Sequence, residues 1–207
     1  MPVQVSPQHY EFQKYDHFER WSSYWYQIRA ALAVQPRTVL EIGSGTGVFR
    51  SYLEGRGVKV EALDVDATRR PEHVADVSDL DTTLPAGLRF DCVAAFQVLE
   101  HLPYDRFEAC LSGLARRAAP WCLLSLPYHG VQLRVAVNVA GVRVSRGVSL
   151  PFPWQLKFNG EHHWELGWEH PVRAVTRTIA RHFEVVERGF VPENPYHYLW
   201  VLRSRGA

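Results

Sequence analysis

The stretch Val39-Leu-Glu-Ile-Gly-Ser-Gly-Thr-Gly47 constrains the fold of this chain more than any other, because an apolar run ends there in closely spaced glycines. The apolar run predicts a buried strand, and residues 47–56 read as a helix. A backbone without side chains at such a turn can lie against a ligand, while the following helix offers unpaired N–H groups to negative charge. The stretch therefore predicts a nucleotide-type ligand site.

The spacing of the glycines separates classes of ligand. The fingerprint of nicotinamide dinucleotides is Gly-x-Gly-x-x-Gly. After Gly43 and Gly45, the third glycine would fall at position 48, where this chain has Val48, and Gly47 comes one residue early. The spacing disfavours a dinucleotide, and a nicotinamide oxidoreductase stays open as an alternative.

Two aspartates follow the next expected strands. Asp64 follows residues 58–63, where a carboxylate can accept hydrogen bonds from both ribose hydroxyls. Asp76 follows residues 73–75, where it could accept a hydrogen bond from an adenine amino group. Asp64 or the nearby Asp66 could instead cap a turn, and Asp79 and Asp81 stand near Asp76 as competing carboxylates.

The ordered series Val-Leu-Glu-Ile-Gly-Ser-Gly-Thr-Gly, Leu-Asp-Val-Asp, Ala-Asp-Val, Phe-Asp-Cys-Val and Val-Leu-Glu-His-Leu resembles the class I methyltransferases that depend on S-adenosylmethionine (SAM), over residues 37 to about 127. The resemblance implies SAM as the cofactor and S-adenosylhomocysteine as its product. It implies cofactor-binding roles for Glu41, Gly43, Ser44, Gly45, Gly47, Asp64, Val65, Asp76, Val77, Phe96 and Gln97. By the same resemblance the glycines face the methionine part, Asp64 holds the ribose, and Asp76 frames the adenine with the amide of residue 77.

The order of expected elements predicts the fold class. Strands are expected near 37–42, 58–63, 73–75, 90–96, 121–126, 184–190 and 196–203, with helices near 17–33, 47–56, 104–117 and 171–182. Asp16 with Glu19 resembles a capping box for the first helix. Parallel strands joined by helices predict an α/β fold with a Rossmann-like, doubly wound sheet and the ligand at the strand carboxyl ends. The family resemblance makes the sheet seven-stranded with an antiparallel seventh strand.

At 207 residues the chain suits one methyltransferase domain. We expect an N-terminal aromatic helical cap over 1–35, a SAM-binding core over 36–127, a substrate-side insertion after the fifth strand over 128–170, and a closing helix and strands over 171–207. In the cap, Phe18, Trp21, Trp25 and Ile28 recur at helical spacing. That spacing predicts packing against the sheet, with a lid over the substrate as the alternative.

The insertion has two halves. Residues 131–150 alternate well enough to predict a hairpin that turns at Ala140-Gly141, although some apolar positions also suit a helix. Residues 151–168 gather aromatic and imidazole side chains without regular pattern. A histidine there could accept a proton from an acceptor hydroxyl, so His129, His162 and His163 are the catalytic candidates. Each of them could instead hydrogen-bond within the loop.

The pattern Gln97-x-x-Glu100-His101 resembles, imperfectly, the acidic-x-x-Glu-His pattern of ubiquinone-pathway O-methyltransferases, which implies a divalent cation. Gln97 replaces the first carboxylate, which weakens a site for a hard cation. We therefore expect no metal. Three cysteines, Cys92, Cys110 and Cys122, are too widely spaced for a zinc pattern and are expected to be buried free thiols.

Charge and hydropathy bear on partners. The formal net charge is +1, and the 23 basic residues are scattered, which disfavours nucleic acid as a partner. The N-terminus does not read as a signal peptide and no apolar run has the length of a membrane span, so we expect a soluble cytoplasmic protein, as a monomer or homodimer. The predicted function is methyl transfer to a small molecule in a bacterial biosynthetic pathway, at oxygen first and nitrogen second. Alternatives are carbon methylation, SAM chemistry without methyl transfer, and an inactive SAM-fold binding protein.

Overall fold

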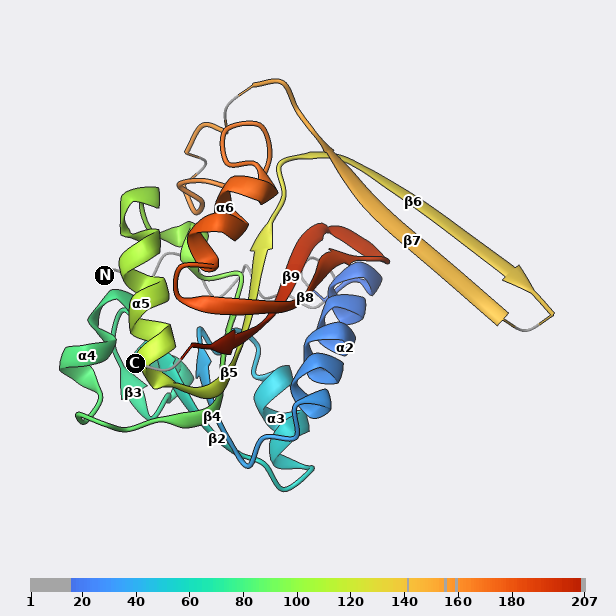
Figure 1. Cartoon of the computed structure of the whole chain (residues 1–207). Helices are drawn as coiled ribbons and strands as arrows, with labels where there is room; N and C mark the ends of the chain where they lie inside the picture. The colour runs from blue at the N-terminus through green and yellow to red at the C-terminus, as the bar shows by residue number, and fades with distance from the viewer. Residues whose placement is uncertain (1–15, 141, 155, 159, 206–207) are drawn as a thin grey trace.

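A seven-stranded sheet with helices on both faces forms the body of the molecule in the computed structural model, which describes residues 16–140, 142–154, 156–158 and 160–205 (Figure 1). The strands of the sheet are β1 (Thr38–Ile42), β2 (Lys59–Asp64), β3 (His73–Val74), β4 (Phe90–Phe96), β5 (Ala118–Pro127), β8 (Phe183–Val191) and β9 (Asn194–Ser204). The order across the sheet is β3-β2-β1-β4-β5-β9-β8. Strands β1 to β5 are mutually parallel, and β9 is antiparallel to both of its neighbours. The predicted α/β class and the antiparallel seventh strand are confirmed.

The helices connect the strands much as the sequence predicts. They are α2 (Phe18–Ala33), α3 (Val48–Glu54), α4 (Leu80–Thr83), α5 (Phe107–Arg117) and α6 (Val172–Ile179), with 3-10 turns η2 (Ala67–Arg69), η3 (Val77–Asp79), η4 (Leu99–His101) and η5 (Tyr104–Arg106). None of the described helices is long and apolar enough to cross a membrane.

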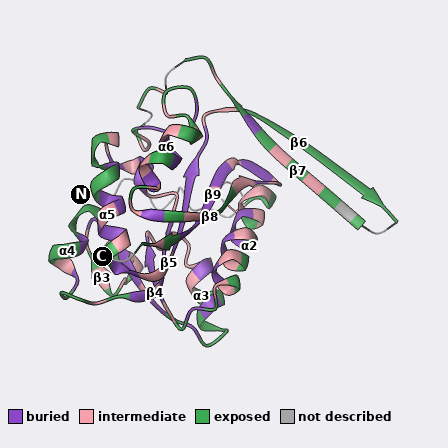
Figure 2. Cartoon of the chain, viewed as in Figure 1, coloured by how far each residue is buried: buried purple, intermediate pink, exposed green. Residues whose placement is uncertain are grey.

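Successive side chains of each strand point to opposite faces of the sheet, and a hydrophobic core lies on each face (Figure 2). In β4, Val93 and Ala95 join the core beneath α5 and α6, whereas Cys92 and Ala94 join the core beneath α2 and α3. Successive side chains of a strand point to opposite faces, so an apolar run without alternation is buried on both sides. This burial fixes the carboxyl ends of β1, β2 and β4 at one edge of the sheet.

Two predictions for the first helix are wrong. No side-chain capping box forms: His17 occupies the N-cap position, and its ring lies 3.0 Å from Glu19. The aromatic stripe is not in the core either, because Phe18, Trp21 and Trp25 are 60%, 46% and 57% exposed. The helix instead buries its smaller and more polar face, made of Ser23, Tyr24, Gln27 and Ala31. The aromatic residues that precede position 16 lie outside the described residues.

The insertion begins as the predicted hairpin rather than a helix. Strands β6 (Gly130–Val139) and β7 (Val142–Pro151) pair antiparallel along their whole length and project from the body (Figure 1). Ala140 in the turn has a φ of +49°. The segment that follows has little regular structure, as expected, and returns to the sheet through a bridge between Tyr128 and Leu166. All three cysteines are buried and free, as predicted.

Candidate active site at the carboxyl edge of the sheet

The glycine-rich turn after β1 adopts a backbone that side chains disfavour. Gly43, Gly45 and Gly47 have φ values of +74°, +51° and +77°. The Gly43 amide donates to the Leu63 carbonyl of β2 at 2.8 Å. A Cβ built on Gly43 would lie 2.6 Å from Cγ2 of Val98, which follows β4. The turn is therefore pressed between β2 and the segment after β4, and a side chain at its first glycine has no room.

Asp64 holds this turn in place. Its Oδ2 accepts hydrogen bonds from the Ser44 amide at 2.8 Å and from the Ser44 hydroxyl at 3.0 Å. Its Oδ1 accepts from the Asp66 amide at 2.9 Å. The Arg69 guanidinium donates to the Gly45 carbonyl from the same side, a contact that the sequence did not indicate. The structure thus brings together Asp64 and the predicted glycine turn, and Oδ1 of Asp64, which accepts one hydrogen bond, keeps a further lone pair.

Asp76 caps the turn that opens η3, a role that the sequence analysis does not predict for it. Its Oδ1 accepts hydrogen bonds from the Ser78 amide at 2.9 Å and from the Ser78 hydroxyl at 2.8 Å, at the start of η3. Asp76 and Val77 are both buried, whereas Val65, after β2, is partly buried. Oδ1 of Asp76 already accepts the two hydrogen bonds from Ser78. The predicted hydrogen bond from an adenine amino group would therefore go to Oδ2 of Asp76.

Glu41 is a buried carboxyl near the end of β1. It is 4% exposed, and its Oε2 has no hydrogen-bond partner among the described residues. Burial raises the pKa of Glu41 to about 8, against the opposing attraction of Arg50. Buried charged groups are normally paired. An unpaired carboxyl oxygen beside the glycine turn therefore fits an ammonium group such as that of a methionine moiety.

The two residues predicted from the end of β4 lie at the same edge. The Phe96 ring packs edge-on against Phe49 of α3, with ring centroids 5.1 Å apart. Gln97 has a φ of +58°, and its Nε2 donates to the Ser125 hydroxyl at 3.0 Å. The left-handed backbone at Gln97 turns the chain from β4 into η4, which places the next acidic residue inside the molecule.

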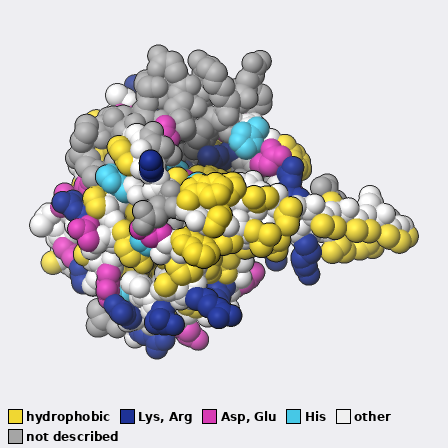
Figure 3. All heavy atoms as spheres, turned by 90° about the horizontal axis from the view of Figure 1, so that it is seen from above, with side chains coloured by type: hydrophobic (Ala, Val, Ile, Leu, Met, Phe, Trp, Pro, Cys, Tyr) yellow, Lys and Arg dark blue, Asp and Glu magenta, His cyan; other side chains and the backbone are white. Residues whose placement is uncertain are grey.

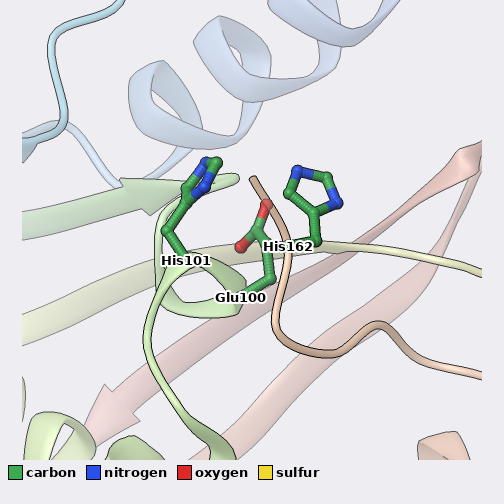
Figure 4. Close-up of side chains that lie close together, drawn as sticks. All are labelled: Glu100, His101 and His162. Atoms are coloured by element: carbon green, nitrogen blue, oxygen red, sulfur yellow. The ribbon is translucent and has the colours of Figure 1, made fainter. Parts of the chain in front are cut away.

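A compact group of three titratable side chains lies beyond that turn (Figure 4). Glu100, His101 and His162 each bring a ligand atom within 4.8 Å of the others. Glu100 is fully buried, and neither of its carboxylate oxygens has a hydrogen-bond partner among the described residues. The rings of His101 and His162 meet edge-on with centroids 4.9 Å apart. Residues from η4 and from the insertion thus share one buried polar centre, here named the Glu100 cluster.

Backbone hydrogen bonds hold the insertion against η4. The His163 amide donates to the Glu100 carbonyl at 2.9 Å, and Nδ1 of His101 lies 2.9 Å from the Glu161 carbonyl. His101 and Glu161 are 60 residues apart in sequence, so these contacts join distant parts of the chain. The position of His162 is therefore set by the main chain on both sides of it.

Hydrogen bonds and charge prepare His162 to hold a proton. Its Nδ1 lies 2.7 Å from Oε1 of Glu165, which also accepts a hydrogen bond from the Tyr196 hydroxyl at 2.8 Å. Burial acts to lower the pKa of His162, but the Glu165 hydrogen bond and the Glu100 charge outweigh it and raise the pKa. Burial raises the pKa of Glu100 to about 7. Burial and the nearby Glu165 raise the pKa of Tyr196, which stays a hydrogen-bond donor.

The other two catalytic candidates lie outside the Glu100 cluster. His163 is exposed, and its ring lies against Phe158 with centroids 4.6 Å apart. His129 is partly buried against Phe152, with centroids 5.0 Å apart, and its Nε2 is buried without a hydrogen-bond partner among the described residues. His163 contributes its backbone rather than its ring, and His129 supports the base of the β6–β7 hairpin.

Sequence reasoning did not identify three members of this environment as site residues. Glu100 and His101 enter the sequence analysis only as part of an imperfect metal pattern. Tyr196 lies in β9, far along the chain, and the neighbouring His197 is also buried, with burial lowering its pKa well below the ordinary value. The polar pair Tyr196-His197 within an apolar closing strand is the sequence signal that could have indicated a buried polar centre.

The Glu100 cluster has donor atoms suited to either of two chemistries. One carboxylate with two imidazoles is a set that divalent transition metals accept. The same groups, with pKa values displaced toward neutrality, can take up and release a proton. Gln97 supplies no carboxylate to a cation, and a metal-free site remains a prediction.

Two comparisons of the sequence with known proteins bear on the family of this chain. A family model described as a methyltransferase domain matches residues 15–165, which is most of the chain. A search of curated protein sequences gave no significant match.

Solved structures of similar fold cover almost the whole chain. N-methyltransferase NodS from Bradyrhizobium japonicum WM9, in complex with S-adenosyl-L-homocysteine, has a TM-score of 0.59 at 15% identity, covering 98% of this chain and 94% of NodS. 1,6-Didemethyltoxoflavin-N1-methyltransferase from Burkholderia thailandensis has a TM-score of 0.57 at 19% identity, covering 99% and 92%. Magnesium protoporphyrin IX methyltransferase (ChlM) from Synechocystis PCC 6803, with bound SAM, has a TM-score of 0.57 at 16% identity, covering 98% and 88%. At such identities the likeness establishes the fold. With the family match, it follows that the chain belongs to the methyltransferase domain family and has the Rossmann-like, seven-stranded fold of the class I SAM-dependent methyltransferases.

Proposed function

We propose that this chain transfers the methyl group of SAM to a hydroxyl or phenol oxygen of a small-molecule acceptor. The observation that carries the proposal is the Glu100 cluster, which places a proton-accepting pair at the same sheet edge as the glycine turn. Val98 links the two parts, because it packs against Gly43 and lies two residues before Glu100. An oxygen acceptor needs such a base, whereas an unprotonated amine does not.

Residues at the ends of β1 and β2 suit the cofactor. The Gly43–Gly47 turn offers backbone without side chains, and positions 45 and 47 face open space where a Cβ would meet nothing within 4 Å. Glu41 offers a buried carboxyl oxygen without a partner among the described residues to an ammonium group. Asp64 offers the remaining lone pair of Oδ1 to a ribose hydroxyl. When bound, SAM supplies an electrophilic methyl group and leaves as S-adenosylhomocysteine.

On the acceptor side, His162 is the proposed general base. It takes the proton that the acceptor hydroxyl loses as the new oxygen–carbon bond forms. Glu165 orients the ring through Nδ1, and Tyr196 holds Glu165 in turn, so the imidazolium that results is stabilised by a carboxylate 2.7 Å away. Glu100 adds a second carboxyl that can share this proton, because its pKa of about 7 is close to neutrality.

The insertion also offers aromatic surface for an acceptor. Trp154, Phe158 and Trp168 are exposed in the segment between β7 and α6. Phe152 and Trp154 stack with centroids 4.6 Å apart. Exposed aromatic side chains near a polar centre favour a planar or largely apolar acceptor, since such sites combine apolar walls with a few placed polar groups.

The test is product formation from SAM with a panel of phenols, other alcohols and amines. Methyl transfer requires one equivalent of S-adenosylhomocysteine per product and a product heavier by one CH₂ unit, which mass spectrometry resolves. The oxygen proposal expects a methyl ether, identified by the methyl carbon shift in nuclear magnetic resonance. Products methylated only at nitrogen or carbon would refute the choice of oxygen.

Nitrogen is the second candidate acceptor atom, because two of the solved structures of similar fold are named as N-methyltransferases. The His162→Gln variant separates the two. Transfer to oxygen should fall by about 10²–10⁴-fold when the base is lost, whereas transfer to an unprotonated amine should change little. Failure to bind SAM by calorimetry would leave the inactive-protein alternative instead.

A further inference from the structure

The β6–β7 hairpin has one face that is almost entirely apolar. The antiparallel register pairs Val131 with Leu150, Leu133 with Val148, Val135 with Arg146, Val137 with Val144, and Val139 with Val142, and directly paired residues share a face. Nine of these ten side chains are valine or leucine, each between 47% and 66% exposed. Figure 3 shows yellow side chains along the projecting hairpin. These ten residues are here named the apolar face.

The opposite face of the hairpin contacts the body of the molecule near the sheet. Arg134 donates from that face to the Glu19 carboxylate and to the Glu193 carbonyl, both at 2.9 Å. Its partner Gly147 packs so closely that a Cβ there would lie 2.4 Å from the Pro192 carbonyl oxygen. These contacts reach only the half of the hairpin nearer the sheet. The valine and leucine side chains of the apolar face are nevertheless exposed in every row of the hairpin.

A bare hairpin of this kind is not a stable end state in water. Two-stranded hairpins are marginal without a third strand or a packed face. The exposed fractions correspond to about 700 Å² of apolar surface, beyond the roughly 300–600 Å² of the largest patch on a typical monomer. Two such faces packed together would bury about 1,400 Å², within the range of standard specific interfaces.

We propose that the apolar face is the homodimer interface, covered by the same face of a second copy of this chain. A closed two-fold dimer uses one patch on both subunits, which must then be complementary to itself. A flat stripe of valine and leucine meets this requirement, as in the face-to-face packing of β-sheets. Arg146 is the one charged residue on the face, and it lies in the middle row of the five, opposite Val135.

A lipid surface fits the same hairpin less well. Both outer edges of the β6–β7 pair lack strand partners among the described residues, and hydrocarbon does not tolerate open strand edges. A second copy leaves those edges in water while it covers the side chains. The hairpin begins directly after His129 and ends at Pro151, next to Phe152, so dimerisation would also fix the base of the substrate-side insertion.

The experiment is sedimentation equilibrium of the full chain over a concentration series. The test variant is Val137→Lys with Val144→Glu, a directly paired couple on the apolar face. Opposite charges across the strands preserve the hairpin while they make the face polar. The matched control is Ala136→Lys with Ser145→Glu, the adjacent pair on the opposite face. Circular dichroism and thermal unfolding of both variants establish that they fold.

The wild-type chain is expected to be a dimer, the test variant to weaken self-association by about 100-fold or more, and the control to stay within about threefold of wild type. A monomeric wild type, or equal dissociation constants for both variants, would overturn the proposal. If the wild-type chain is monomeric and floats with vesicles of phosphatidylcholine and phosphatidylglycerol, the proposal is overturned, and the apolar face binds a lipid surface instead of a second copy.

Discussion

Replacing Gly43 by alanine tests whether the turn after β1 is as tightly enclosed as its geometry indicates. The residue has a φ of +74°, and the added Cβ would lie 2.6 Å from Cγ2 of Val98. Valine is branched at Cβ and stiff about χ1, so this methyl group cannot simply rotate away. Either the turn or the segment after β4 must move.

Two costs add in this variant. A left-handed backbone costs a residue with a side chain about 1–2 kcal/mol, and forcing a methyl group into a packed contact costs about 1–3 kcal/mol. We therefore expect the free energy of unfolding to fall by about 2–5 kcal/mol. For a chain of this size each kcal/mol lowers Tm by about 2–4 °C, which gives a fall of roughly 4–20 °C.

The assay is thermal and urea unfolding of Gly43→Ala with two companion variants. Gly45→Ala has the backbone cost alone, because a Cβ there meets nothing within 4 Å, so it should lose about 1–2 kcal/mol. Val98→Ala removes the obstructing methyl group. In the double-mutant cycle, Gly43→Ala and Val98→Ala should be coupled by about 1–3 kcal/mol in the favourable direction. Additive effects, or equal losses for Gly43→Ala and Gly45→Ala, would refute the reasoning.

Three further predictions concern the site. His162→Gln should lower kcat by about 10²–10⁴-fold and leave the SAM dissociation constant within about threefold, whereas His163→Gln should leave both nearly unchanged in steady-state kinetics and calorimetry. The folded pKa of Glu41, about 8, lies above its ordinary 4.5, so the stability it contributes is present at low pH and is lost as the pH rises toward 8. Glu41→Gln should therefore raise Tm by several degrees relative to wild type at pH 8 and change it little at pH 4, which scanning calorimetry measures. Dialysis against a chelator should leave the methyltransferase activity unchanged. If the activity is lost and then returns when a divalent cation is added, the Glu100 cluster is a metal site.

Local pattern predicted the fold because the decisive signals were local. The apolar run before Gly43 and the alternation over residues 131–150 each specify an element without distant partners. The aromatic stripe on α2 failed for a physical reason. Hydrophobic spacing identifies a helix face but not what covers it, and here Tyr24 and Ser23 face inward through contacts with Thr46 and Asn194.

The site was predictable only in part. The glycine turn and Asp64 come from neighbouring strands and follow from the strand order. The Glu100 cluster depends on main-chain contacts between η4 and a loop sixty residues later, which no periodic signal encodes. His162 was therefore one of three equal candidates in the sequence, and burial and hydrogen bonding distinguish it from His129 and His163.

Isothermal titration calorimetry of the wild-type chain with SAM tests the central claim most directly, with NADH as the comparison ligand. The account predicts saturable binding of one SAM per chain and no binding of NADH. It further predicts that Asp64→Ala, which removes both the ribose acceptor and the partner of Ser44, weakens SAM binding at least about tenfold. Undetectable heat with SAM, or an unchanged dissociation constant for Asp64→Ala, would contradict it.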